Sequence, residues 1–285
     1  MQNIQARSFN SMDIRLLRKD DIKSFHKAFT TAFANNTVLF NPTMEEFEHR
    51  IFQKLRMDFD ISAATFDGED ILGFISHTSN TYEGIPTAFN GGTGVIPGFR
   101  NQKIAEQLYE FLIPKIRSKF IARVLLEVVE SNKTAIRLYE KIGFTYRRSF
   151  QCYKMVKSLG NDVENVAEED IGKLNHDFAD FEPSFIDSIQ QLRKGKEKVL
   201  VYKKENQTVG YVIFQPHIGR ISQLAVSRLH RGGKIGLSLL NAAQKESLKP
   251  ITIMNVPDDE TGFDTFLKKC GFENQVNQFE MELIV

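Results

Sequence analysis

The segment N132-K-T-A-I-R-L-Y-E-K-I-G-F144 decides the fold of this chain more than any other stretch. It follows the apolar, β-branched run Arg123–Val129, which is typical of a buried strand. The spacing predicts a helix over Lys133–Ile142, with Gly143 behind it as a C′ glycine. Tyr139 lies about two turns after Asn132, so the two residues can share a face of this helix.

A second motif lies upstream, in V95-I-P-G-F-R-N-Q-K-I-A105. A strand ends here, Pro97 breaks its pairing, and a short loop leads into a helix. A helix N-terminus offers unpaired N–H groups and a positive dipole end, which suits a pyrophosphate. Arg100 and Lys103 add positive charge, and the small Ala105 allows close approach. Taken alone, the motif is equally well explained as a basic loop before an amphipathic helix.

Four landmarks recur in the same order later in the chain. Residues 13–29 match 162–178, I71-L-G-F-I75 matches T208-V-G-Y-V212, F99-R-N-Q-K-I-A105 matches H230-R-G-G-K-I-G236, and K141-I-G-F144 matches K269-C-G-F272. The offset falls from 149 to 128, so the second copy is shorter between landmarks. We therefore predict two tandem copies over 12–156 and 162–285, a leader over 1–11 that could be flexible, and a polar linker over 157–161.

The predicted fold class is α/β, a mixed sheet flanked by helices, with the order β-α-α-β-β-β-α-β-α-β in each copy. In the first copy Asp20 is expected to cap a helix that runs through Phe33. Thr43 and Glu46 form a capping-box pattern for the next helix. A pair of strands is expected over 145–155.

The two motifs resemble those of the GCN5-related N-acetyltransferase (GNAT) superfamily, in the order that this family shows. The resemblance covers 12–156 and, with fewer matches, 162–285. The stretch from Asn132 to Phe144 closely matches the family's Asn-x-x-Ala-x-x-x-Tyr-x-x-x-Gly-Phe segment. The stretch from Arg100 to Ala105 matches Gln/Arg-x-x-Gly-x-Gly/Ala at its ends, with Lys103 where glycine is usual.

This resemblance implies an acyl-CoA-dependent N-acetyltransferase with acetyl-CoA as donor and CoA as product. It implies that loop amides bind the CoA pyrophosphate, that Asn132 holds the pantetheine and that Tyr139 protonates the leaving thiolate. The cofactor-binding residues implied in the first copy are Val95, Arg100, Asn101, Gln102, Lys103, Ile104, Ala105 and Asn132.

Two carboxylates compete for the role of general base. The L-E-V and S-N spacing is similar to the GNAT subgroup that acetylates protein N-termini, which implies that Glu127 is the base. A plainer interpretation makes Glu127 a solvated strand residue. Tyr82, Glu83 and Asn90 belong to the segment that usually borders the acceptor amine, so Glu83 is the alternative base.

The second copy repeats one motif and loses the other. Its phosphate loop is carried by Arg231, Gly232, Gly233, Lys234 and Gly236, which are the cofactor-binding residues implied there. Counting back from Gly271, Leu267 stands at the tyrosine position and Glu260 at the asparagine position. Leucine donates no proton, so we expect a structural or substrate-shaping copy that could still bind CoA.

Composition limits the partners. The formal net charge is +1 and no apolar run approaches a membrane span, so we expect neither nucleic acid nor membrane as a partner. Two cysteines in 285 residues indicate no disulfide framework and favour a reducing, cytoplasmic compartment. His26, His49 and His77 have no ligand spacing, so no metal is expected. We expect a monomer or a homodimer.

The leading hypothesis is acetyl transfer by direct attack of a primary amine in the first copy. The acceptor could be a small molecule, a protein N-terminus or a lysine, and the acyl group could be another short chain. The alternative from a different class is a non-catalytic acyl-CoA-binding or interaction protein. A nucleotide-binding regulator is a third possibility, which rests on the phosphate loop alone.

Overall fold

The computed structural model describes residues 13–34, 41–160, 163–174, 179–195 and 197–285. The chain divides into two compact units: unit 1 is Met1–Val124 with Leu283–Val285, and unit 2 is Leu125–Glu282. The predicted leader and Phe178, which closes the first predicted match, lie outside the described residues. The division into units falls within a strand of the first copy, whereas the repeat predicts a boundary between the copies.

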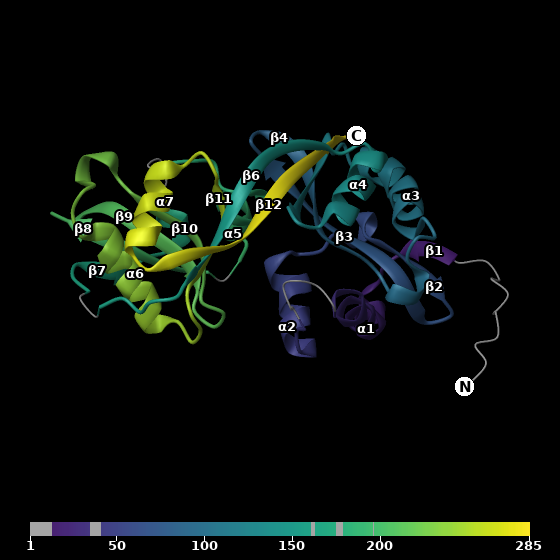
Figure 1. Cartoon of the computed structure of the whole chain (residues 1–285), viewed down its shortest axis with the longest axis horizontal. Helices are drawn as coiled ribbons and strands as arrows, with labels where there is room; N and C mark the ends of the chain where they lie inside the picture. Colours follow the sequence, from purple (N-terminus) through teal and green to yellow (C-terminus); the bar gives the residue numbers. More distant parts are fainter. Residues whose placement is uncertain (1–12, 35–40, 161–162, 175–178, 196) are drawn as a thin grey trace. The chain divides into compact units, whose positions relative to one another are not determined.

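Unit 1 is an antiparallel sheet with helices on both faces (Figure 1). Its elements are β1 (Asp13–Leu16), α1 (Ile22–Phe33), α2 (Met44–Glu48), β2 (Ala63–Asp67), β3 (Asp70–Tyr82), β4 (Ile85–Val95) and α3 (Ile104–Ser118). The strands follow the order β1-β2-β3-β4, and each is antiparallel to the next. Helices α1 and α3 lie on opposite faces of this sheet, as Figure 1 shows.

Helix α1 has a different N-cap from the one predicted. Its N-cap is Asp21 rather than Asp20, after a 3-10 turn over Lys19–Asp21. The Asp21 carboxylate accepts two hydrogen bonds from Arg15, at 2.7 and 2.8 Å, and one from the Arg18 backbone N–H at 2.8 Å. These bonds close the 3-10 turn, and α1 starts at the next residue without a capping bond from the Asp21 side chain.

Phenylalanines fix α1 to the sheet. The ring centroids of Phe25 and Phe47 are 5.1 Å apart, and those of Phe25 and Phe74 are 4.9 Å apart, both in edge-to-face arrangements. A β-carbon built on Gly94 would fall 2.5 Å from the Phe74 ring, so glycine at this position leaves room for that ring. Within the described residues, no helix combines the length and apolar character that crossing a membrane requires.

Unit 2 contains most of β5 and β12 and all the elements between them. In chain order these are β5 (Arg123–Val129), α4 (Lys133–Ile142), β6 (Thr145–Met155), β7 (Val166–Glu168), α5 (Ile189–Leu192), β8 (Lys198–Lys204), β9 (Gln207–Gln215), β10 (Arg220–Val226), α6 (Ile235–Glu246), β11 (Thr252–Pro257), α7 (Thr261–Lys269) and β12 (Phe272–Ile284). The strand order is β5-β12-β6-β11-β10-β9-β8-β7. The sheet is mixed because β10 and β11 are parallel while β11 and β6 are antiparallel.

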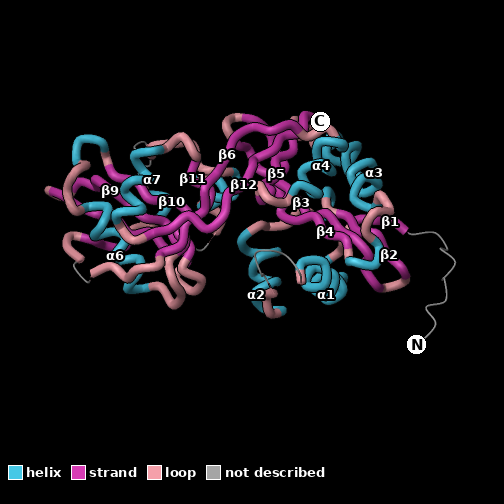
Figure 2. Tube along the Cα trace, viewed as in Figure 1, coloured by secondary structure: helices cyan, strands magenta, loops and turns pink. Residues whose placement is uncertain are grey.

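The final strands of the two copies are exchanged. Strand β6, which ends the first copy, pairs with β11 of the second copy, and β12, which ends the second copy, lies between β5 and β6. Figure 2 shows β6 and β12 as two long strands side by side. The predicted strand pair over 145–155 is wrong, because this segment is one uninterrupted strand whose partners come from the second copy.

The repeat is visible in matched contacts within each copy. A β-carbon on Gly73 would fall 2.6 Å from Ile104, the first residue of α3, and one on Gly210 would fall 3.0 Å from Ile235, the first residue of α6. In both copies a strand glycine therefore lets the helix start approach closely. This contact places the predicted phosphate loop against the sheet in each copy.

Candidate functional site

The phosphate loop of the first copy lies in unit 1, between β4 and α3. A 3-10 turn over Pro97–Phe99 follows the strand. Arg100 Nε donates to the Val95 carbonyl at 3.2 Å, and its Nη2 donates to the Ala32 carbonyl at 2.9 Å. The guanidinium therefore clamps the loop to the end of α1. Any anion at this loop is left mainly to the backbone N–H groups and to Lys103.

The start of α3 offers those N–H groups. Gln107 N–H donates to the Lys103 carbonyl at 3.0 Å, which makes it the first intrahelical donor of α3. The N–H groups of Ile104 and Ala105 precede it, at the start of the helix where no acceptor within the helix is available. Such groups at the positive end of the helix dipole form a suitable site for phosphate oxygens.

Two residues of this loop have left-handed backbones. Asn101 has a φ of 64° and Lys103 has a φ of 61°, with Gln102 between them. Glycine adopts this conformation without a steric cost, whereas a lysine does so at some cost. The structure thus explains why glycine is usual at position 103 in the family that the motif resembles. Lysine keeps the same backbone shape there.

Glu83 lies on the hairpin between β3 and β4, with a φ of 53°. Its carboxylate accepts a hydrogen bond from Arg123 Nη2 at 2.9 Å, and the Arg123 side chain is only 5% exposed. Arg123 also donates to Thr87 Oγ1 and to the Tyr82 carbonyl, both within unit 1. Glu83 therefore neutralises a buried cation, which is a structural use of its charge.

The asparagine and tyrosine of the second motif lie in unit 2. Asn132 is the N-cap of α4, and its Oδ1 accepts a hydrogen bond from Ala135 N–H at 3.1 Å. Because Asn132 is exposed, its amide nitrogen can reach a ligand. Tyr139 is buried on the inner face of α4, where its ring packs edge-to-face against Phe144 at 5.6 Å between centroids. The predicted C′ role of Gly143 is confirmed by its left-handed φ of 110°.

Glu127 points into a buried polar region of unit 2. The residue as a whole is half-buried, but its Oε1 is shielded from solvent and has no hydrogen-bond partner among the described residues. Burial, together with the nearby Asp187 and Glu280 carboxylates, raises the pKa of Glu127 to about 7. The nearby amide of Asn255 and the charge of Arg220 act on this pKa in the opposite direction. A carboxylate that titrates near neutral pH is suited to general base catalysis.

The second copy contains a ligand-sized cavity, which lies wholly in unit 2. It has a volume of about 310 Å³. One wall is formed by the loop and the start of α6, with Arg231, Gly232, Gly233 and Gly236 among the lining residues, and the other by Glu260, Phe263 and Phe266 of the α7 segment. Four of the five residues predicted to bind a cofactor in this copy therefore line one cavity. The fifth, Lys234, is the N-cap of α6.

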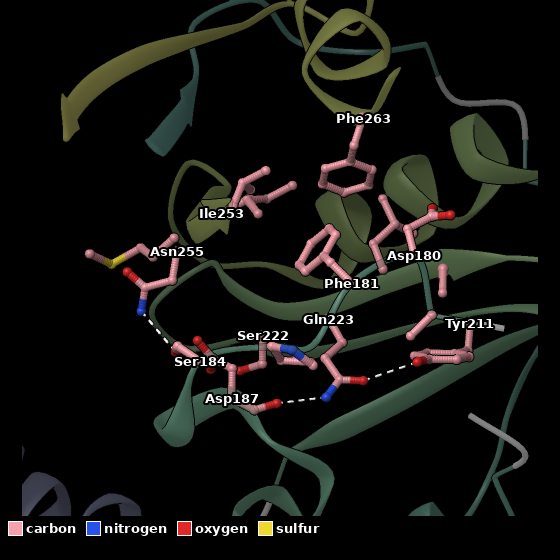
Figure 3. A pocket seen from close by; sticks show the side chains of 16 residues that line it. Asp180, Phe181, Ser184, Asp187, Tyr211, Ser222, Gln223, Ile253, Asn255 and Phe263 are labelled. Carbon is pink, nitrogen blue, oxygen red and sulfur yellow. Dashed lines mark hydrogen bonds between the residues drawn. The ribbon is translucent and has the colours of Figure 1, made fainter. Parts of the chain in front are cut away.

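A smaller cavity of about 30 Å³ shares Asp180, Leu224, Ala225 and Phe263 with the large one. Figure 3 shows Phe181 and Phe263 at one end of it and a chain of polar groups at the other. The ring centroids of Phe181 and Phe263 are 5.7 Å apart. Asn255 Nδ2 donates to Ser184 Oγ at 3.0 Å at the polar end, as the dashed line in Figure 3 marks.

Carboxylates change the electrostatics of the large cavity. Arg231 Nε donates to the Val226 carbonyl at 2.9 Å, and its Nη2 lies 2.5 Å from Asp180 Oδ1. Burial and the neighbouring Asp180 and Asp259 carboxylates raise the pKa of Glu260. A phosphate bound by this loop must therefore lie near two lining carboxylates, those of Asp180 and Glu260. The phosphate loop of the first copy contributes no carboxylate.

Asn255, Asp180 and Phe263 were not singled out from the sequence. The offset of 128 that pairs Tyr139 with Leu267 also pairs Glu127 with Asn255, so counting back from Gly271 could have found it. No comparable signal marks Asp180 or Phe263. No group of three or more His, Cys, Asp or Glu residues that could hold a metal ion occurs in the described part of the chain.

The comparisons agree with this architecture. Residues 23–144 match the acetyltransferase (GNAT) family, and residues 164–285 match an acetyltransferase (GNAT) domain. These folds and loops define a chain of the GNAT class of α/β proteins. The chain belongs to the GNAT superfamily and carries two of its domains in tandem.

Similar proteins share the fold across nearly the whole chain. A tandem GNAT protein from the clavulanic acid biosynthesis pathway has a TM-score of 0.71 at 14% identity, covering 96% of this chain and 98% of that one. N-alpha-acetyltransferase 30 of Dictyostelium discoideum is 34% identical over 86 residues, which is 30% of this chain and 46% of that protein. The ribosomal protein bS18-alanine N-acetyltransferase of Escherichia coli is 39% identical over 67 residues, which is 22% of this chain and 44% of that protein. The chain thus matches less than half the length of these curated relatives.

Proposed function

We propose that this protein transfers an acetyl group from acetyl-CoA to a primary amine, with the proton transfers assigned to residues of the first copy. The observation that supports this proposal most is the difference between the residues at matched positions of the two copies. The first copy has Glu127, with a pKa of about 7, and Tyr139. The second copy has Asn255 and Leu267 at these positions, and neither side chain exchanges protons near neutral pH.

Acetyl-CoA, when bound, supplies the acetyl group as a thioester. The N–H groups at the start of α3, together with Lys103, are suited to its phosphates, and the exposed amide of Asn132 is suited to its pantetheine arm. Glu127 accepts a proton from the acceptor ammonium, directly or through one water molecule. The free amine then attacks the thioester carbonyl, and the C–S bond breaks. Tyr139 donates the proton of its Oη to the departing sulfur and is restored by the proton that the new amide nitrogen loses. We favour Glu127 over Glu83 as the base because Glu83 is paired with the buried Arg123.

The pKa of Glu127 also favours one class of acceptor. An α-amino group has a pKa of about 7.7–8, and a lysine amine has a pKa of about 10.4. Proton transfer to a carboxylate with a pKa of about 7 is unfavourable by roughly one pKa unit from an α-amino group and by more than three pKa units from a lysine amine. We therefore propose a protein or peptide N-terminus as the preferred acceptor. The names of the two partial relatives, an N-alpha-acetyltransferase and an alanine N-acetyltransferase of a ribosomal protein, agree with this choice.

Release of free thiol from acetyl-CoA tests the proposal. A panel of one short peptide with a free N-terminus, Nα-acetyl-lysine and a polyamine should give the highest rate with the peptide. The rate should fall below about pH 7 as Glu127 becomes protonated. Glu127→Gln should lower kcat by about 100-fold or more and remove this fall. Binding of CoA without thiol release with any amine would instead support a non-catalytic acyl-CoA-binding protein.

A non-catalytic role is favoured for the second copy by its cavity. The cavity of about 310 Å³ next to a phosphate loop is suited to a ligand, while Leu267 supplies no proton. Arg231→Ala should leave the turnover of the first copy intact and weaken any second CoA-binding event measured by calorimetry. Loss of turnover in this variant would contradict the assignment of catalysis to the first copy.

A further inference from the structure

The large cavity of the second copy has a net negative charge. With His230 counted as neutral, its charged lining residues are two carboxylates, Asp180 and Glu260, and one guanidinium, that of Arg231. All of them lie in unit 2. The volume of about 310 Å³ is at the lower end of the range for small-molecule pockets. The sign of the charge therefore limits which small molecules suit this cavity.

The loop arginine of this cavity is already paired with a carboxylate. Nε of Arg100 and Nε of Arg231 each donate to the carbonyl of the residue five positions earlier. The second contact differs between the copies. Arg100 Nη2 donates to the neutral Ala32 carbonyl at 2.9 Å. Arg231 Nη2 instead lies 2.5 Å from Asp180 Oδ1, so its positive charge is compensated before any ligand binds.

Glu260 leaves one negative charge of the cavity without a partner. It is the N-cap of α7, at the position that Asn132 has in α4, but its side chain makes no capping bond. Within the part of the chain that the structure describes, its carboxylate makes no ion pair. Burial and nearby carboxylates raise the pKa of Glu260 and outweigh the charges of Arg228 and Arg231. A cation next to this carboxylate would stabilise its ionised form.

Phenylalanine rings form the apolar part of the same wall. Phe263 and Phe266 of α7 are half-buried and line the cavity, with ring centroids 6.2 Å apart. The offset of 128 pairs them with Ala135 and Leu138, so the first copy has no aromatic ring at either position. A β-carbon on Gly236 would fall 2.9 Å from the Phe266 ring. This ring therefore lies against the start of α6, beside the N–H groups that would bind a phosphate.

We propose that the cavity of the second copy binds a small organic cation, a primary ammonium with an apolar body, in place of CoA. The ammonium group pairs with Glu260, and the apolar body packs on Phe263 and Phe266, whose ring faces attract cations. CoA would instead bring phosphate charges close to two carboxylates. This inference goes beyond the proposed function, because it requires no reaction in the first copy.

Calorimetry on the full chain at pH 7 tests the inference, with phenethylammonium as the probe and 2-phenylethanol as a neutral molecule of the same shape. The wild type should bind the amine at least about tenfold more tightly than the alcohol. Glu260→Gln should abolish this preference. Glu260→Asn introduces the N-cap residue of α4 and should do the same, which keeps the test valid if the glutamine variant does not fold. The control Glu127→Gln removes a carboxylate of the first copy and should leave the preference in place.

Competition with CoA separates a cation site from a phosphate site. Saturating CoA should leave phenethylammonium bound, and displacement of the amine by CoA would overturn the inference. Equal affinity of the wild type for the amine and the alcohol would overturn it too, as would a preference lost in Glu127→Gln but kept in Glu260→Gln. None of these measurements depends on thiol release, so the inference and the proposed function can fail separately.

The cation could come from a free amine or from a peptide N-terminus. The dipeptide amide Phe-Ala-NH2 and its Nα-acetyl form distinguish these sources. Binding of the free dipeptide more tightly than phenethylammonium, with loss on acetylation, would identify a peptide N-terminus. Weaker binding of the dipeptide than of phenethylammonium would identify a free amine. Both results support a cation site in the second copy.

Discussion

Helices α4 and α7 begin with the same backbone conformation but carry different chemistry. The N-cap of α4, Asn132, has φ and ψ of −81° and 67°, and the N-cap of α7, Glu260, has −81° and 61°. Asn132 caps its helix with its side chain, whereas Glu260 makes no such bond. Tyr139 and Leu267, each seven residues after the N-cap of its helix, are both buried. The duplicated fold has thus kept its geometry while only one copy has kept groups that exchange protons.

The largest expected effect is a loss of kcat from a substitution in α4 that has no counterpart in α7. Tyr139→Phe keeps the ring that packs on Phe144 but removes the proton that we assign to the leaving thiolate, so kcat should fall by about 100-fold. The measurement is thiol release at saturating acetyl-CoA.

The matched variant in the second copy is Leu267→Phe, which adds a ring where no proton transfer is assigned. Its kcat should stay within about threefold of the wild type. Equal losses in both variants would show that packing, and not the tyrosine proton, accounts for the effect.

Acid should destabilise the first copy more than the second. Burial lowers the pKa of His77 on β3 to about 4, whereas the matching residue of β9 is Phe214, which does not titrate. Nδ1 of His77 lies 2.7 Å from the Ile61 carbonyl, and Nε2 has no partner among the described residues. The folded state therefore favours the neutral ring.

The unfolded chain binds this proton at about pH 6.5 and the folded chain at about pH 4. The stabilisation is present above pH 6.5 and is lost as the pH falls to 4, to a total of about 3 kcal/mol. Urea unfolding between pH 7.5 and 4 measures it. In His77→Phe the corresponding part of the slope should vanish, and an unchanged slope would exclude His77 as its source.

The strand glycines behind the two phosphate loops should differ in how well they tolerate replacement by alanine. A β-carbon on Gly73 falls 2.6 Å from Ile104 Cγ2, and one on Gly210 falls 3.0 Å from Ile235 Cγ2. Overpacking should cost about 2 kcal/mol in Gly73→Ala and about 1 kcal/mol in Gly210→Ala. Thermal unfolding of both variants measures the difference. If Gly210→Ala costs more, the two loops pack less alike than their matched contacts indicate.

The smallest effect concerns the loop lysines. Lys103 has a φ of 61°, while Lys234 at the same position of the second copy has a φ of −88°. Lys103→Gly relieves left-handed strain and should stabilise the protein by a few tenths of a kcal/mol, after the entropy cost of glycine of roughly 0.5–1 kcal/mol. Lys234→Gly relieves none and should destabilise it by roughly 0.5 kcal/mol. Changes of the same sign in both variants would contradict the difference in backbone.

Local signals made most of the fold predictable. The capping box at Thr43 and Glu46 is present with both reciprocal bonds, at 2.9 and 3.2 Å, because it depends only on residues three apart. Strand β5 and helix α4 have the predicted bounds, since apolar run, cap and C′ glycine all agree there. The N-cap of α1 was misplaced because adjacent aspartates look alike until Arg15 selects one of them.

Long-range pairing was not predictable. Nothing within residues 145–155 tells which strand pairs with them, because alternation reports a strand and not its partner. The hydrogen bond from Gln278 on β12 to Asn255 on β11 follows from that pairing, so it too was hidden. The candidate residues of the first copy could be named from their spacing, and the structure places Glu83 with the phosphate loop in unit 1, and Glu127, Asn132 and Tyr139 in unit 2. Their catalytic roles stay predictions.

The exchange of β6 and β12 means that the two copies are not separable modules. A protein cut in the linker over 157–161 would leave β5 without β12 and β11 without β6, each with an open row of backbone N–H and C=O groups. Such halves should rejoin one another or pair with copies of themselves, as subunits of a strand-swapped dimer do. The linker corresponds to a covalent fusion of the two subunits of such a dimer. In the fused chain, one copy can lose its proton-transfer residues while its strands still complete the shared sheet.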